Sequence, residues 1–130
     1  MSNCAFVKGL YDAAGRGEPG VLIGALAADV KWHEAEGNPY AANSPYVGQS
    51  GVVGLLGAIA SEIADFRIEV ANVIDGGDTV AVEGRYKGTG MKTKKPMDAQ
   101  FVHVWHLNGQ TVVKFQQYTD TKQWVDVLGR

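Results

Sequence analysis

The stretch FVHVWHLNGQTVVKFQQY, residues 101–118, decides the fold of this 130-residue chain. It contains two runs of alternating side chains, 99–107 and 111–118, and the dipeptide Asn108-Gly109 between them is typical of a two-residue hairpin turn. Successive side chains of a strand point to opposite faces of its sheet. The stretch therefore predicts an antiparallel hairpin with one apolar face and one mixed face.

The segments on either side of this hairpin extend the predicted sheet. Residues 66–72 and 79–87 alternate in the same way, and the turn residues 75–78 join them into another hairpin. The lysine-rich segment 88–96 predicts a solvated hairpin tip. Residues 121–128 place apolar side chains on one side and predict a short closing helix.

The first half of the chain contains most of the helical signals. Apolar residues recur every three to four positions up to the glycines at 15–17, and a second short helix restarts at Glu18-Pro19. The pattern then changes to a strand over 30–34, and a Pro- and Asn-containing loop over 37–48 is long enough to act as a lid. A third helix is expected over 52–66.

The order of these elements predicts the fold class. Helices come first and antiparallel strands follow, which favours an α+β domain spanning 1–130, with a curved, cone-shaped antiparallel sheet wrapped around the N-terminal helices. We expect such a cone to enclose a pocket. No internal repeat or composition change suggests a second domain.

The composition excludes several classes of function. The net charge of -2 provides no positive field for nucleic acid, and no apolar run approaches the ~20 residues of a membrane span. The start of the chain lacks the features of a secretion signal, so we expect a cytoplasmic protein. The lone cysteine, Cys4, can form neither an internal disulfide nor a multi-cysteine zinc site.

Several segments, in this order, carry a resemblance to a known family. They are Leu10-Tyr11-Asp12-Ala13 with Arg16-Gly17-Glu18, residues 26–34, Tyr46-Val47-Gly48, Asp78-Thr79-Val80, residues 101–105 with Asn108-Gly109, and residues 115–121. Together they resemble the nuclear transport factor 2-like superfamily, in particular its SnoaL-like and ketosteroid-isomerase-like branch. The resemblance implies a cystatin-like cone, and a scaffold that hosts isomerases, cyclases, dehydratases and proteins without chemistry.

Strand alternation selects two titratable residues for the pocket. Trp32 is the natural core-facing residue of its strand, so Glu34 should point inward beside it. His103 shares a face with Phe101 and Trp105. Glu34 is interpreted as a general base or as a solvated carboxylate at the rim, and His103 as a proton donor or as a hydrogen-bonded core residue. As a coupled pair, they should show a raised His103 pKa.

The resemblance implies roles for these and three further residues. The ketosteroid isomerases remove a proton beside a carbonyl with an Asp at the position that Glu34 resembles, and use a protonated carboxylic acid where His103 stands. SnoaL-like cyclases have a functional Asp resembling Asp120, which the sequence equally explains as a helix N-cap. Tyr11 resembles the oxyanion-hole tyrosine, and Gln117 can direct its amide into the cavity.

These residues define a predicted function. The catalytic set is Glu34, His103 and Asp120, and the ligand-binding set is Tyr11, Trp32, Phe101, Trp105, Phe115 and Gln117. They predict acid–base chemistry beside a carbonyl of an apolar small-molecule ligand, of the isomerase, cyclase or dehydratase type, without metal or organic cofactor. The alternative is a non-catalytic ligand-binding or dimerisation module of the same fold.

The outer face of the sheet predicts a partner. Val102, Val104 and His106 alternate with the pocket residues, and 112, 114, 116 and 118 are expected beside them on the convex face. A monomer rarely leaves such an apolar patch in water. We therefore expect a homodimer through the convex sheet face, as the resemblance also implies.

Overall fold

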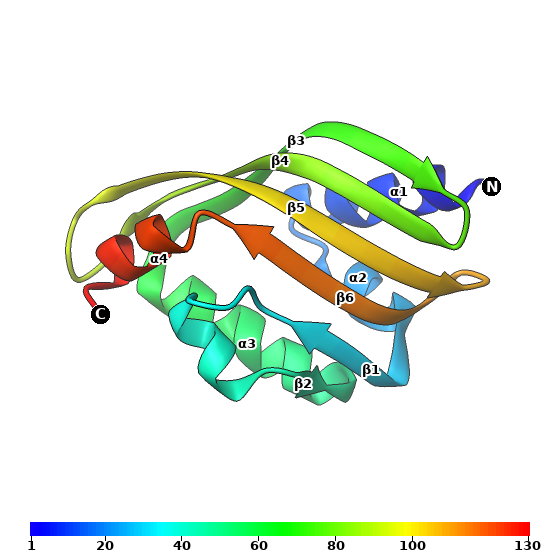
Figure 1. Ribbon diagram of the computed structural model, residues 1–130, viewed down its shortest axis with the longest axis horizontal. Helices are drawn as coiled ribbons and strands as arrows, with labels where there is room; N and C mark the ends of the chain where they lie inside the picture. Colours follow the sequence, from blue (N-terminus) through cyan, green and yellow to red (C-terminus); the bar gives the residue numbers. More distant parts are fainter.

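Six strands form one curved sheet in the order β2-β1-β6-β5-β4-β3 (Figure 1). The computed structural model describes residues 1–130. The strands are β1 (Leu26–His33), β2 (Tyr46–Val47), β3 (Ile63–Gly76), β4 (Thr79–Gly90), β5 (Pro96–Asn108) and β6 (Thr111–Thr119). The expected α+β class with a curved sheet is confirmed. The sheet is mixed, because β1 pairs in parallel with β6 and antiparallel with β2.

The helices are gathered against one side of this sheet. They are α1 (Asn3–Gly15), α2 (Pro19–Ala25), the 3-10 helix η1 (Pro39–Asn43), α3 (Gly48–Glu62) and α4 (Thr121–Leu128). Figure 1 shows α1, α2 and α3 behind the sheet, with α4 at the end of β6. Local chemistry starts two of them, since Ser2 caps α1 by accepting from the Ala5 amide and Asp120 caps α4.

The third helix ends earlier than the sequence pattern predicted. Its apolar period continues through Ile63 to Phe66, but α3 stops at Glu62 and β3 begins at Ile63. Pairing of Ile63 with Gly90 in the sheet takes these residues out of the helix. Asp65 has a positive φ of 53°, which marks the irregular start of β3.

The segment 37–48 is more ordered than the loop that was expected. Residues 39–43 form η1, with Asn38 capping it through the Tyr40 amide. Tyr46-Val47 forms β2 at the edge of the sheet, beside Lys31 and Trp32 of β1. Tyr40 is buried, so this segment is part of the packed structure.

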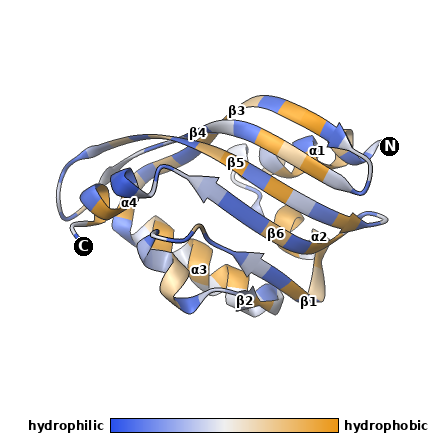
Figure 2. Ribbon diagram, in the orientation of Figure 1, coloured by the Kyte–Doolittle hydropathy of each residue, from blue (hydrophilic) through white to orange (hydrophobic).

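Strand alternation holds on β1 and β5 but shifts on β6. Every second residue of β5 is buried, as expected. Figure 2 shows hydrophobic and hydrophilic residues alternating along this strand. A bulge lies where Leu107 pairs with Val112 and His106 pairs with Lys114. Val112 is therefore buried and Val113 exposed, the reverse of the predicted faces, because the extra residue shifts the alternation by one.

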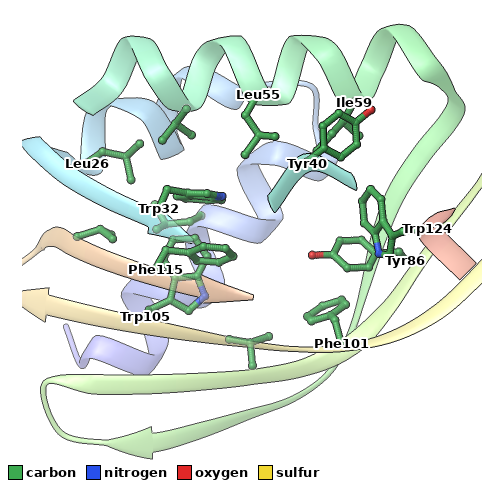
Figure 3. Packing of buried hydrophobic residues seen from close by; sticks show 14 of the residues in the cluster. Leu26, Trp32, Tyr40, Leu55, Ile59, Tyr86, Phe101, Trp105, Phe115 and Trp124 are labelled. Carbon is green, nitrogen blue, oxygen red and sulfur yellow. The ribbon is translucent and has the colours of Figure 1, made fainter. Parts of the chain in front are cut away.

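The core lies between the sheet and the helices. A cluster of 23 buried apolar residues draws on α1, α3, α4, η1 and five strands, and Figure 3 shows part of it. In Figure 3, Leu55 of α3 points toward Trp32, and Ile59 lies further along the helix near Tyr40. No helix is long and apolar enough to cross a membrane.

Candidate functional site

A cavity of about 80 Å³ lies between the concave face of the sheet and the helices. A cavity needs roughly 10–15 Å³ to hold one water, so this cavity has room for several waters or a small organic group. Of its 17 lining residues, 14 are hydrophobic. The remaining three, Glu34, His103 and Gln117, are all sequence-predicted site residues.

The cavity meets the surface between α1 and β3. Tyr11 and Ile68 line it and also line a surface groove that runs between these two elements. Ile68 is 38% exposed, while Tyr86, its partner on the neighbouring strand β4, is 3% exposed. Tyr11 therefore lies on the mouth side of the cavity and Tyr86 lies deep inside it.

Glu34 is buried directly beyond the last residue of β1. Its side chain is 5% exposed, and its Oε2 accepts a hydrogen bond of 3.2 Å from the Trp32 indole. The Trp32 ring stacks on Phe115 at 3.7 Å between centroids. Ser44 holds the local backbone by accepting from the Glu34 amide at 3.0 Å.

Burial sets the protonation of this carboxyl. It raises the pKa of Glu34 from 4.5 to about 7, and the Trp32 hydrogen bond opposes this rise only in part. Near neutral pH both forms of the carboxyl are present in comparable amounts. Such a group can accept a proton and return it, as a general base and then an acid must.

His103 is held by hydrogen bonds at both of its ring nitrogens. Nδ1 lies 2.6 Å from the Tyr11 hydroxyl, and Nε2 makes a short hydrogen bond with the Tyr86 hydroxyl. The Phe101 ring stacks on the imidazole at 4.0 Å between centroids. Both nitrogens are thus occupied by tyrosines, and these tyrosines line the same cavity.

The expected rise in the His103 pKa is wrong. Burial lowers this pKa to about 3, and Glu34 contributes no opposing shift. The apolar surroundings disfavour the imidazolium, and both polar contacts are with neutral hydroxyls. His103 is therefore neutral at physiological pH.

Two more side chains extend the hydrogen-bonded chain. Trp105 donates its indole N–H to the Tyr11 hydroxyl at 2.8 Å, and Gln117 donates its amide to the Tyr86 hydroxyl at 2.8 Å. The cluster Trp105–Tyr11–His103–Tyr86–Gln117 is called the hydroxyl relay below. It joins α1, β4, β5 and β6 around one side of the cavity.

Gln117 is fixed in one orientation by two donors. Its Oε1 accepts from the Ala35 backbone amide at 3.1 Å and from the Asn38 side chain at 3.0 Å. A backbone N–H can only donate, so the amide nitrogen of Gln117 must face Tyr86. Residues 35–38, which directly follow Glu34, are thereby tied to the relay.

Two of the sequence-predicted residues do not line the cavity. Phe101 packs behind His103 and Tyr86, with its ring 4.7 Å from the Tyr86 centroid. Asp120 accepts from the Gln123 amide at the start of α4, so the capping interpretation describes its position. The other predicted residues, Tyr11, Trp32, Glu34, His103, Trp105, Phe115 and Gln117, all line it.

The sequence interpretation missed Tyr86. Val80, Val82, Gly84 and Tyr86 alternate on β4 and are all buried, and this period was the available signal. Gly84 leaves room for the Phe101 ring on the neighbouring strand, which a Cβ would meet at 2.7 Å. His33 and His106 are only partly buried and lie off the cavity, and no group of three or more potential metal ligands forms.

Comparisons with known proteins agree with this fold. The model of the SnoaL-like domain matches residues 7–115. A nuclear transport factor 2-like protein from Burkholderia thailandensis is 27% identical over 98% of both chains, with a TM-score of 0.92. One of unknown function from Burkholderia pseudomallei is 26% identical over 100% of both chains, with a TM-score of 0.88.

A more distant structure shares the fold alone. It is a putative SnoaL-like polyketide cyclase from a Jannaschia species, 16% identical, with 98% of this chain and 92% of that chain covered and a TM-score of 0.82. A search of curated proteins finds no match.

Proposed function

Because this chain belongs to the SnoaL-like domain family, we propose that it is a small-molecule enzyme that moves a proton beside a carbonyl group. The observation that carries the proposal is the buried Glu34 carboxyl. It has a pKa of about 7 and lines the same cavity as the neutral hydroxyl relay. An isomerase, cyclase or dehydratase reaction of this kind needs only a base and a hydrogen-bond donor.

In the proposed mechanism, ionised Glu34 removes the proton from the carbon next to the carbonyl. The carbonyl oxygen then carries developing negative charge, which a tyrosine hydroxyl of the relay stabilises by donating a hydrogen bond. Protonated Glu34 returns the proton to the same carbon or to a neighbouring one. His103 acts through Tyr11 and Tyr86, because both its nitrogens already contact these hydroxyls.

The apolar walls support this chemistry. Trp32, Trp105, Phe115 and the leucines of α1–α3 exclude water, which strengthens the polar contacts within the cavity. The ligand is therefore proposed to be a small apolar carbonyl compound. Asp120 takes no part in proton transfer in this proposal, since it caps α4.

The proposal is tested with cyclopentanone, a small apolar ketone with exchangeable hydrogens beside its carbonyl. The protein should accelerate deuterium exchange at that carbon, followed by NMR, and Glu34→Gln should lower the rate by about 10²–10⁴-fold. Glu36→Gln is the matched control, because Glu36 is exposed two residues further along and its loss should leave the rate unchanged.

The pH dependence adds a second check. Only the ionised carboxylate is a base, so the rate should rise with pH and level off above about 7. Ligand binding without any exchange at this carbon would favour the alternative, a non-catalytic ligand-binding module.

We also propose that two copies pair through the convex face of the sheet. Tyr118 is 56% exposed and Val113 is 38% exposed, and the half-buried Val102 and Val104 lie on the same face. The helices α1–α3 cover the concave face and leave this one open (Figure 1). The cytoplasmic location expected from the sequence stays a prediction.

A further inference from the structure

The donors and acceptors of the hydroxyl relay limit which tyrosine hydroxyl can donate a hydrogen bond to a ligand. The Trp105 indole can only donate, so the Tyr11 oxygen accepts one hydrogen bond from it. The fixed amide of Gln117 donates to the Tyr86 oxygen in the same way. Each hydroxyl oxygen therefore has one acceptor position filled before His103 is considered.

His103 cannot treat its two tyrosines alike. A neutral imidazole has one N–H and one bare nitrogen, so it donates to one hydroxyl and accepts from the other. The same three protons, one on the ring and one on each hydroxyl, are present in both tautomers. With the proton on Nδ1, His103 donates to Tyr11 and accepts from Tyr86; with the proton on Nε2, both directions reverse.

We infer that the tautomer of His103 selects which tyrosine hydroxyl donates into the cavity. With Nδ1 protonated, the Tyr11 hydrogen is free and the Tyr86 hydrogen is held by the ring. With Nε2 protonated, the Tyr86 hydrogen is free and Tyr11 is held. The inference deepens the proposed function, because it takes the cavity as the ligand site, and it makes His103 a positioning residue.

This arrangement selects a class of ligand and a depth of binding. The relay offers one hydroxyl donor at a time, which suits a ligand with a single acceptor oxygen. Tyr11 lies at the mouth and Tyr86 lies deep in the cavity, so the tautomer determines where that oxygen binds. The negative charge of Glu34 acts on Tyr86, and an ionised Glu34 therefore favours a free hydrogen on Tyr86.

Imidazole nitrogen NMR on protein with ¹⁵N-labelled histidine tests the inference without any ligand. Tyr11→Phe removes the partner of Nδ1, so the ring should keep its proton on Nε2, where Tyr86 can accept it. Tyr86→Phe should shift the proton to Nδ1. Tyr118→Phe is the matched control, since this exposed tyrosine lies outside the cavity. The His103 tautomer in this variant should equal that of the wild type.

The aromatic oxyanion 4-nitrophenolate provides a test in the wild-type protein, should either buried-tyrosine variant fold poorly. Bound with its oxygen at Tyr11, it should shift the ring towards the Nδ1-protonated tautomer, and Tyr11→Phe should weaken its binding about tenfold or more. Identical tautomers in both variants, or a ring protonated on both nitrogens at neutral pH, would overturn the inference. Absence of ketone exchange would instead count only against the proposed base Glu34.

Discussion

At the scale of single residues, one physical cause sets both titratable groups of the cavity. Burial disfavours charge, so it raises the pKa of Glu34 to about 7 and lowers the pKa of His103 to about 3. Both side chains are therefore neutral over a common range of pH. The carboxyl alone changes its charge near neutrality, which makes Glu34 the group whose state an assay at physiological pH can follow.

The Glu34 shift predicts how stability depends on pH. Between pH 4.5 and about 7 the unfolded chain has lost this proton while the folded protein keeps it, so stability should fall as pH rises and become level above about 7. Glu34→Gln should remove this fall, which is about 3 kcal/mol in full. Urea unfolding across this range measures the difference between the two proteins.

The same experiment has an internal control. Glu36→Gln should reproduce the wild-type curve, since Glu36 is exposed. His103 contributes the opposite slope between about pH 3 and 6.5, but it does so in all three proteins and cancels in the comparison. Parallel curves for wild type and Glu34→Gln would mean that the carboxyl titrates normally.

At the scale of elements, the ends of helices and strands decide which side chains reach the cavity. Glu34 lies one residue beyond the end of β1, where Ser44 accepts a hydrogen bond from its amide, and its side chain is buried. Asp120 occupies the corresponding end of β6, yet the start of α4 takes its carboxylate as a cap. Two acids at strand ends thus have different roles, and the element that follows each strand makes the difference.

Substitution of Asp120 separates capping from catalysis. Asp120→Ala should lower the free energy of unfolding by about 1 kcal/mol, while Asp120→Asn should retain most of it, because Asn caps about as well as Asp. Thermal unfolding and ketone exchange are measured on the same samples. A stable Asp120→Asn variant that lost exchange would restore the catalytic interpretation of this residue.

At the scale of the whole molecule, the sheet divides the protein into a covered and an uncovered side. The concave side and the helices enclose the 23-residue core, and we propose that residues 1–130 unfold as one domain around it. The convex side retains exposed apolar residues, including Tyr118. A second copy of the same face would cover them with a mixed apolar and polar interface.

The dimer is tested by one charge placed on that face. Val104→Lys should yield a species near 13.9 kDa in sedimentation equilibrium, where the wild type should be twice as heavy, because a buried lysine opposes the contact. Val53→Lys is the control, since Val53 is exposed on α3, away from the sheet face. A wild-type mass near 13.9 kDa would reject the dimer, and an unaffected Val104→Lys dimer would reject this interface.

The sequence by itself determined which side chains face inward on β1 and β5. Strand alternation has a period of two, so Trp32 and Trp105 were enough to direct Glu34 and His103 into a common cavity. The α+β class followed from the order of helices and strands, and the pair Asn108-Gly109 located the central hairpin. These features depend on neighbours within a few residues, which a single sequence displays directly.

Only the tertiary structure decided the partners of those side chains. Tyr11 and His103 are 92 residues apart in the chain, and Tyr86 meets His103 from another strand, so no local spacing indicates either contact. The bulge that buries Val112 depends on how β5 and β6 pair. Hydrogen-bond partners and the burial that shifts a pKa arise from register and packing between distant segments, and these are properties of the folded chain.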